Sequence, residues 1–227
     1  MKKNNDKKMS RQEYIDFLSN KSNEINMSNK NSKTGIGCLN LAFPTCVCRN
    51  DAPCKKTCYA NKGCQQISTV QAAYYRNLRL YNDNPDDFFE QMFYKVKFSG
   101  LQKVRLFDSG DFPDYDFLVR LVKLCHNTPN VKYMAFTKKY ELVNKFLEKK
   151  KEHKLPDNLN IIYSAWDKLW EFDNPFHLPV AYVDFNDKRL NPEFPKLAIE
   201  CPGIQTTCSA CGACWSKKIK SVVFKQH

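Results

Sequence analysis

The chain has 227 residues, of which 42% are hydrophobic and 13% aromatic, enough apolar side chains for the core of one ordinary domain. This composition excludes wholesale disorder, and no apolar run reaches the roughly 18 residues that a membrane-spanning helix requires. The two unusual quantities are a net charge of +12 and 11 cysteines. Because no apolar stretch follows the N-terminus, we expect no secretory signal and a cytoplasmic protein without a membrane partner.

Residues 1–33 are predicted to form a basic, partly disordered segment that contains one short helix. Ser10 followed by Glu13 is the pattern of a capping box, which marks the start of that helix. The apolar face of the helix is predicted from residues at helical spacing, namely Tyr14, Phe17 and Leu18. We expect residues 1–9 to be disordered and residues 20–33 to form a polar linker.

Residues 34–227 are predicted to form a single α/β domain that opens with a cysteine-rich loop. Helices are expected at 69–82, 86–98, 114–125 and 139–151. Short apolar runs that suit buried strands are found at 103–107, 131–136, 159–164, 180–185 and 197–201. Strands and helices that alternate at this spacing indicate parallel βα units. We therefore predict a partial TIM-like barrel or an open parallel sheet, with sites gathered at the carboxyl ends of its strands.

All cysteines except Cys125 fall into two clusters, within residues 38–64 and 201–214. A disulfide framework is disfavoured in a reducing cytoplasm, so we interpret both clusters as metal-binding segments. None of the four histidines has ligand spacing to a cysteine, which argues against mixed sites. Cys125 lies on the apolar face of a predicted helix and is interpreted as a small core residue.

The C-terminal cluster has C-x2-C-x2-C spacing and an additional cysteine upstream. Such a tight run of thiolates is typical of iron–sulfur ligation, with the fourth ligand supplied from elsewhere. Structural zinc sites more often use two separated C-x2-C pairs, so the spacing favours an iron–sulfur cluster and leaves zinc as the alternative. The predicted ligands here are Cys201, Cys208, Cys211 and Cys214.

The N-terminal cluster is less regular, and its compact part supplies three predicted metal ligands, Cys48, Cys54 and Cys58. Three further cysteines, Cys38, Cys46 and Cys64, exceed the needs of one site, and each is available as a fourth ligand. With a fourth thiolate the site is closed, and without one it keeps a position open for a substrate or cofactor.

Three stretches of the sequence resemble the gene-product-88 family of phage and mobile-element proteins, from about Thr34 to the C-terminus. These stretches are residues 54–63, 109–112 and 208–215. The end of the first one, Cys58-Tyr59-Ala60, is also similar to spore-photoproduct-lyase-like radical S-adenosylmethionine proteins. That similarity implies a four-iron cluster on Cys48, Cys54 and Cys58, and a cofactor-binding role for Ser109, Gly110 and Asp111. In such proteins, S-adenosylmethionine binds the iron that no cysteine holds.

The positive charge indicates an anionic partner, because basic residues outnumber acidic ones in residues 1–33, in residues 132–154 and after Trp215. The leading hypothesis is an iron–sulfur protein that binds one or two four-iron clusters. In this hypothesis it acts as a radical enzyme on nucleic acid or protein. The alternatives are a zinc-stabilised nucleic-acid-binding protein without catalysis and a redox or interaction scaffold. The sequence leaves open whether the protein is an enzyme, its substrate and its oligomeric state.

Overall fold

The computed structural model describes residues 9–29 and 31–226, whose strands form one sheet in the order β1-β2-β3-β4-β5-β6-β8-β7. The strands are β1 (Met27–Ser28), β2 (Leu39–Leu41), β3 (Lys103–Leu106), β4 (Lys132–Thr137), β5 (Leu159–Ser164), β6 (Val180–Asp184), β7 (Ile199–Glu200) and β8 (Ser221–Lys225). β1 pairs antiparallel with β2, and the other neighbours pair in parallel. In the described part of the chain the sheet is not closed, so the open α/β sheet is the form observed.

The helices are α1 (Arg11–Ser19), α2 (Ser68–Asp83), α3 (Pro85–Phe98), α4 (Tyr115–Asn127), α5 (Tyr140–Glu148) and the short α6 (Cys208–Cys211). The helices from α1 to α5 follow the predicted order, and α6 was not predicted. Helices α2 to α5 pack on one side of the sheet, which we call the outer face. Short 3₁₀ turns make up much of the rest, including four between residues 45 and 66. Within the described residues, no helix is both long and apolar enough to cross a membrane.

Side chains alternate across each strand, so every strand divides its residues between two faces. Toward the outer face, β3 directs Val104 and Leu106 into a large core shared with the helices. Aromatic rings fill much of this core, and Phe43, two residues after the end of β2, contacts the rings of four others. The opposite side, which we call the inner face, receives the alternate residues, such as Arg105 of β3 and Met134 of β4.

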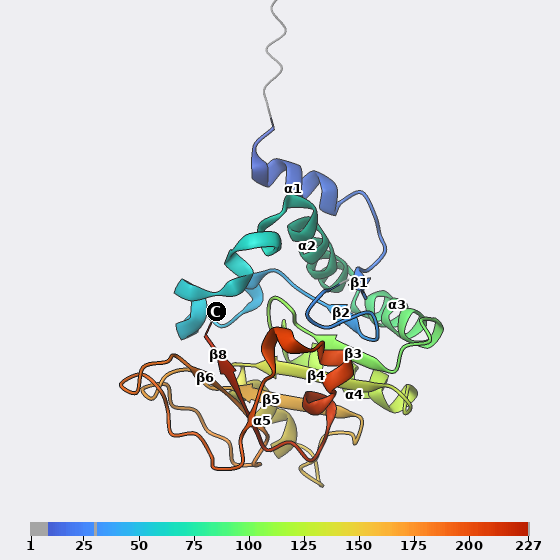
Figure 1. Cartoon of the computed structure of the whole chain (residues 1–227). Helices are drawn as coiled ribbons and strands as arrows, with labels where there is room; N and C mark the ends of the chain where they lie inside the picture. The colour runs from blue at the N-terminus through green and yellow to red at the C-terminus, as the bar shows by residue number, and fades with distance from the viewer. Residues whose placement is uncertain (1–8, 30, 227) are drawn as a thin grey trace, which may run out of the picture.

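The inner face is covered by the tail, residues 201–219, which Figure 1 shows in red in front of the middle strands. The Trp215 indole Nε1 donates to the Val104 carbonyl at 3.0 Å, and Asn160 Nδ2 donates to the Cys214 carbonyl at 2.8 Å. Lys103 Nζ donates to the Ser209 carbonyl. The tail thus occupies the side of the sheet where a closed barrel would have its interior.

The capping box at the start of α1 is confirmed, whereas the predicted apolar face is wrong for Tyr14 and Phe17 and only Leu18 of its residues is partly buried. Tyr14 and Phe17 are 44% and 49% exposed, while Ile15 is 2% exposed. The buried side of α1 is formed by Ile15 and Ser19, because α1 packs on α2, away from the sheet. The predicted disorder of residues 1–9 lies outside the described residues except for Met9.

The strands of the predicted βα units are present from β3 to β6, with boundaries within two residues of the prediction. The run 197–201 contains only the two-residue strand β7, both of whose residues are exposed. Three strands were not predicted. β1 lies in the expected polar linker, β2 lies in the expected loop, and β8 follows the lysines of the tail.

Candidate functional site

The loop that follows β2 carries the predicted N-terminal metal ligands. Its cysteines Cys48, Cys54 and Cys58, which we call the loop group, are partly buried free thiols, while Cys46 and Cys64 are exposed. Burial raises the pKa of Cys48 to about 12, and negative neighbours add to the rise. These neighbours are Asp111 and the two other members of the loop group. Cys48 is therefore within electrostatic range of Asp111, which follows β3, and of the two other thiols.

Asp111 lies at that end of β3 and ties it to β4. Its Oδ1 accepts hydrogen bonds from the Thr137 hydroxyl at 2.6 Å and from the Phe112 amide at 2.8 Å. Its Oδ2 accepts from the Lys138 amide at 3.0 Å. Burial raises the pKa of Asp111, although these hydrogen bonds oppose the rise. In this structure the carboxylate is thus engaged in holding two strand ends together.

Gly110 and Ser109 have different surroundings from Asp111. Gly110 has φ +81°, and a Cβ at this position would lie 2.9 Å from the Phe43 carbonyl oxygen, so a side chain here would clash with the chain after β2. Ser109 is 3% exposed, and its hydroxyl has no hydrogen-bond partner within the described part of the chain. Of the three predicted cofactor-binding residues, Ser109 therefore has the uncommitted side-chain polar atom.

The tail cysteines lie on the inner face, where they are associated with residues of several strands, including β3 and β4. Cys208 and Cys214 pack against Met134 and Trp215. Cys214 also belongs to a second apolar cluster, which includes Cys201. Cys211 is exposed.

Cys38 belongs in space to the tail cysteines, although the sequence places it with the N-terminal cluster. It is fully buried and packs in the same cluster as Cys208 and Cys214. Its pKa is raised to about 12 by burial. Cys38 immediately precedes β2 and lies two residues before Asn40, so the two side chains share the inner face. Recognition of β2 in the sequence would therefore have indicated the position of Cys38.

A polar group that the sequence did not predict lies between the loop group and the tail cysteines. Arg105 Nε pairs with Asp108 Oδ1 at 2.9 Å, and Arg105 Nη1 donates to Cys208 Sγ at 3.8 Å. Asn31 Nδ2 donates to the other Asp108 oxygen at 2.6 Å, and the Tyr59 hydroxyl donates to the Asp108 carbonyl. Burial raises the pKa of Asp108, while Arg105 and Asn31 oppose the rise.

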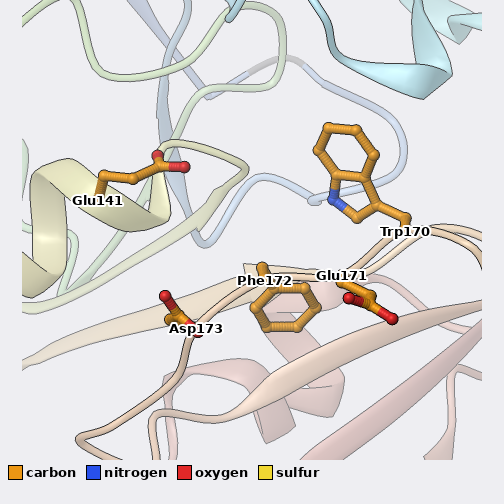
Figure 2. A pocket seen from close by; sticks show the side chains of 5 residues that line it. All are labelled: Glu141, Trp170, Glu171, Phe172 and Asp173. Carbon is orange, nitrogen blue, oxygen red and sulfur yellow. The ribbon is translucent and has the colours of Figure 1, made fainter.

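An open pocket of about 580 Å³ lies beside the loop after β2. Figure 2 shows its lining side chains, Glu141, Trp170, Glu171, Phe172 and Asp173. Arg49, the residue after Cys48, connects the loop to this pocket. Its guanidinium pairs with Glu141 at 3.1 Å and lies 5.2 Å from the centre of the Trp170 ring. Carboxylates and aromatic rings together suit a cationic group.

No three His, Cys, Asp or Glu side chains of the described residues are arranged so that they could hold a metal ion. The donor chemistry nevertheless fits a soft metal centre, because all 11 cysteines are free thiols and most of them gather in two places. Which of these cysteines bind a metal stays a prediction.

The chain matches the family Gene product 88 over residues 1–217. Comparison with the curated proteins and with the solved structures gave no match. The family match gives no support to the similarity with radical S-adenosylmethionine proteins. It covers nearly the whole chain and includes all three stretches that carried the resemblance, so this protein belongs to the Gene product 88 family, a phage-type family.

Proposed function

We propose that this protein binds iron–sulfur clusters, one on the loop group and one on the tail cysteines. The observation that carries the proposal is that all 11 cysteines are free thiols and that one apolar cluster on the inner face joins Cys38 to Cys208 and Cys214, which are distant in the sequence. Soft thiolate donors without nearby histidines favour iron–sulfur clusters or zinc over harder metals. The tight cysteine run of the tail favours iron–sulfur over zinc.

We extend this proposal to an open loop site that binds S-adenosylmethionine. A cluster held by three cysteines has one iron free to bind the cofactor. The cluster would supply an electron to the bound cofactor. The strand order supports this extension, because the cysteine loop follows β2 and Ser109 follows β3, its parallel neighbour. The Ser109 hydroxyl, buried and without a partner among the described residues, is the group proposed to bind the cofactor.

The pocket beside the loop group favours a protein substrate over a nucleic acid at this site. Its three carboxylates, from Glu141, Glu171 and Asp173, would repel phosphates and attract a basic side chain. The chain's own Arg49 already interacts with one of its carboxylates and with its indole ring. We therefore propose a peptide segment with a lysine or arginine as the substrate class.

The test is anaerobic purification followed by analysis of iron, sulfide and zinc. We expect a brown protein whose reduced cluster gives an electron paramagnetic resonance signal that changes on addition of S-adenosylmethionine. Replacement of Cys48, Cys54 and Cys58 with serine should remove that change, while Cys125→Ser, in the core, should preserve it. A colourless protein with stoichiometric zinc would contradict iron–sulfur binding. A signal indifferent to the cofactor would contradict the open site alone.

A second candidate function is zinc-stabilised nucleic-acid binding. The observation that favours it is a row of exposed lysines at the amino ends of the strands, including Lys132 at the start of β4 and Lys220 before β8. Phosphate contacts need such exposed cations and no base-reading element. Zinc on the tail cysteines would then serve to hold the inner face together.

A further inference from the structure

We propose that the end of α3 binds single-stranded nucleic acid by stacking unpaired bases on the rings of Tyr94 and Phe98. We call these two rings together with Lys97 the α3 platform. The proposal rests on the second candidate function, nucleic-acid binding, and specifies the strand type and the contact. It requires no metal, so it stands or falls independently of the iron–sulfur proposal.

Tyr94 and Phe98 form an apolar surface on the exposed side of α3. They are four residues apart, which places them on neighbouring turns of one helix face. Their ring planes are inclined by only 4°, with the ring centroids 5.9 Å apart, and the residues are 47% and 73% exposed. The core of the outer face receives the buried residues of α3, Phe88, Phe89, Met92 and Val96. The two platform rings are thus left at the surface.

The platform also includes a cation that is free to bind a phosphate. Lys97 Nζ lies 5.7 Å from the centre of the Phe98 ring and 5.3 Å from that of the Phe93 ring. Within the described part of the chain, Lys97 forms no ion pair. The acidic residues of α3 are all among its first six, whereas Lys95 and Lys97 belong to its last turn. Rings interleaved with cations are the contacts that single-strand-binding proteins use.

The platform lies at the amino edge of the sheet, where the parallel strands begin. Residues 99–102 connect α3 to β3, and the Gln102 carbonyl accepts from the Lys132 amide at 2.8 Å. Neighbouring strands are about 5 Å apart, so β4 lies about 5 Å and β5 about 10 Å from β3 across the sheet. The chain that leads into these strands is therefore within reach of a ligand that extends from the platform.

Exposed lysines at this edge are complementary in charge to such a ligand. They begin or precede β4, β5 and β8, and they are Lys132, Lys149, Lys150, Lys151, Lys154, Lys218 and Lys220. Residues 128–132, 149–158 and 216–220 contain two acidic side chains, Glu152 and Asp157. A strand whose bases stack on α3 thus has an excess of cations beside it for its phosphates.

Stacking is the contact that separates single strands from duplexes. In a duplex the bases stack on one another, so the rings of a protein surface reach unpaired bases instead. Lysine contacts with phosphates are available to both forms. Since stacking of one base typically changes affinity by about 5- to 150-fold, a single strand should bind more tightly than a duplex of equal length. DNA and RNA strands share these contacts, which do not involve the 2′-hydroxyl.

The experiment measures binding of the full chain to labelled oligo(dT), oligo(rU) and a DNA duplex of equal length by fluorescence anisotropy at low salt. Tyr94→Leu combined with Phe98→Leu removes both rings and keeps the net charge, an apolar side chain at each position and a good helix former. Tyr94→Trp combined with Phe98→Trp is the matched control, because each position keeps a ring. Leu169→Ala controls for loss of exposed apolar surface, since Leu169 is 81% exposed.

We expect the leucine variant to bind oligo(dT) and oligo(rU) at least about fivefold more weakly, the smallest effect of one lost stacking contact, and to bind the duplex unchanged. The tryptophan variant and Leu169→Ala should bind like the unaltered chain. Single-strand affinity that survives the leucine change, or an equal loss for the duplex, would overturn the platform and leave nucleic-acid binding in place. If the unaltered chain binds none of the three ligands, both this proposal and the second candidate function are wrong.

A second measurement covers the case in which the leucine variant fails to fold. In Phe98→Trp alone, stacking on a base should quench the fluorescence of the added indole at saturating oligo(dT). The quenching is measured as the difference between this variant and the unaltered chain, which has three tryptophans of its own. Absence of added quenching would overturn stacking at this position.

Discussion

Arg105 forms a buried ion pair with Asp108. Among single residues, we expect substitution of one member of this pair to lower the stability of the protein. The two side chains are 16% and 7% exposed, and the atoms lie 2.9 Å apart. Arg105→Gln leaves the Asp108 carboxylate buried without its cation, which typically costs about 3–5 kcal/mol. We expect that loss in the free energy of unfolding, measured with urea.

A double-mutant cycle checks this prediction. Asp108→Asn in the Arg105→Gln background removes the unpaired charge, so the double variant should be more stable than Arg105→Gln alone. Lys103→Gln is the matched control, since Lys103 is the other basic residue of β3 and donates to a carbonyl of the tail. Strictly additive losses in the cycle would show that Arg105 and Asp108 act independently.

Glu13 gives a prediction about pH. Its pKa lies below the ordinary 4.5 because the Ser10 amide and hydroxyl form the capping box with it. A carboxyl whose pKa is lowered by folding stabilises the folded state above its unfolded pKa, and this contribution disappears as the pH falls through the folded pKa. Carbon NMR of the Glu13 carboxyl should therefore show titration below 4.5. Ser10→Ala should move the midpoint upward, and an unchanged midpoint would contradict the role of the hydroxyl.

At the scale of elements, Asp114 is the residue on which the start of α4 depends. Its Oδ1 accepts from the Phe117 amide at 2.8 Å and from the Tyr81 hydroxyl at 2.6 Å. Asp114→Ala removes the cap and leaves the Tyr81 hydroxyl without this partner. We expect a loss of about 1–2 kcal/mol in the free energy of unfolding. The control is Asp116→Ala, one residue into the helix, where the exposed pair with Arg120 contributes roughly 0.5 kcal/mol. Equal losses would argue against the cap.

The elements that could be predicted are those with a strong local pattern. The strands β3 to β6 are apolar runs bounded by turn residues, and α4 and α5 have a clear apolar face. β2 has only three residues between a cysteine and a proline-rich loop, and its partner β3 is more than sixty residues away in the chain. Such a strand is defined by its pairing, which a local pattern does not contain.

The candidate site also has parts that could be predicted from the sequence and parts that could not. Spacing was sufficient to single out the loop group and the tail as cysteine clusters. Assignment of Cys38 to the tail was not possible, because it depends on the position of β2 and on the hydrogen bonds that residues 33 and 34 accept from α6. The pair Arg105–Asp108 was also missed, since a basic residue in a short apolar run is equally compatible with an exposed strand face.

At the scale of the whole molecule, the two ends of the sheet differ in chemistry. Parallel strands begin at one edge and finish at the other, so residues that precede different strands share an edge. The acidic pocket lies at the carboxyl edge, because Glu141 is in the first turn of α5, the helix that follows β4. Exposed lysines precede or begin strands at the amino edge, namely Lys132, Lys218 and Lys220. An anionic partner is therefore expected at the edge away from the loop group.

Reversal of charge at the amino edge tests this expectation. Replacement of Lys132, Lys218 and Lys220 with glutamate changes the net charge by six, two for each site. The control replaces three exposed lysines that follow strands or end them, Lys168, Lys188 and Lys225, with the same change in charge. Both variants have the same net charge, so a difference between them reports position. The measurement is a mobility-shift titration with DNA and RNA over a series of salt concentrations.

We expect the amino-edge variant to bind more weakly and the control to bind nearly as well as the unaltered chain. Each phosphate contact contributes about 0.9 to the slope of log affinity against log salt for duplex DNA. Loss of three contacts should therefore reduce that slope by roughly 2.7. Equal weakening in both variants would mean that the overall charge, and not this edge, attracts the nucleic acid. If the unaltered chain retards neither DNA nor RNA at low salt, the nucleic-acid hypothesis is wrong, and the charge of +12 needs another anionic partner.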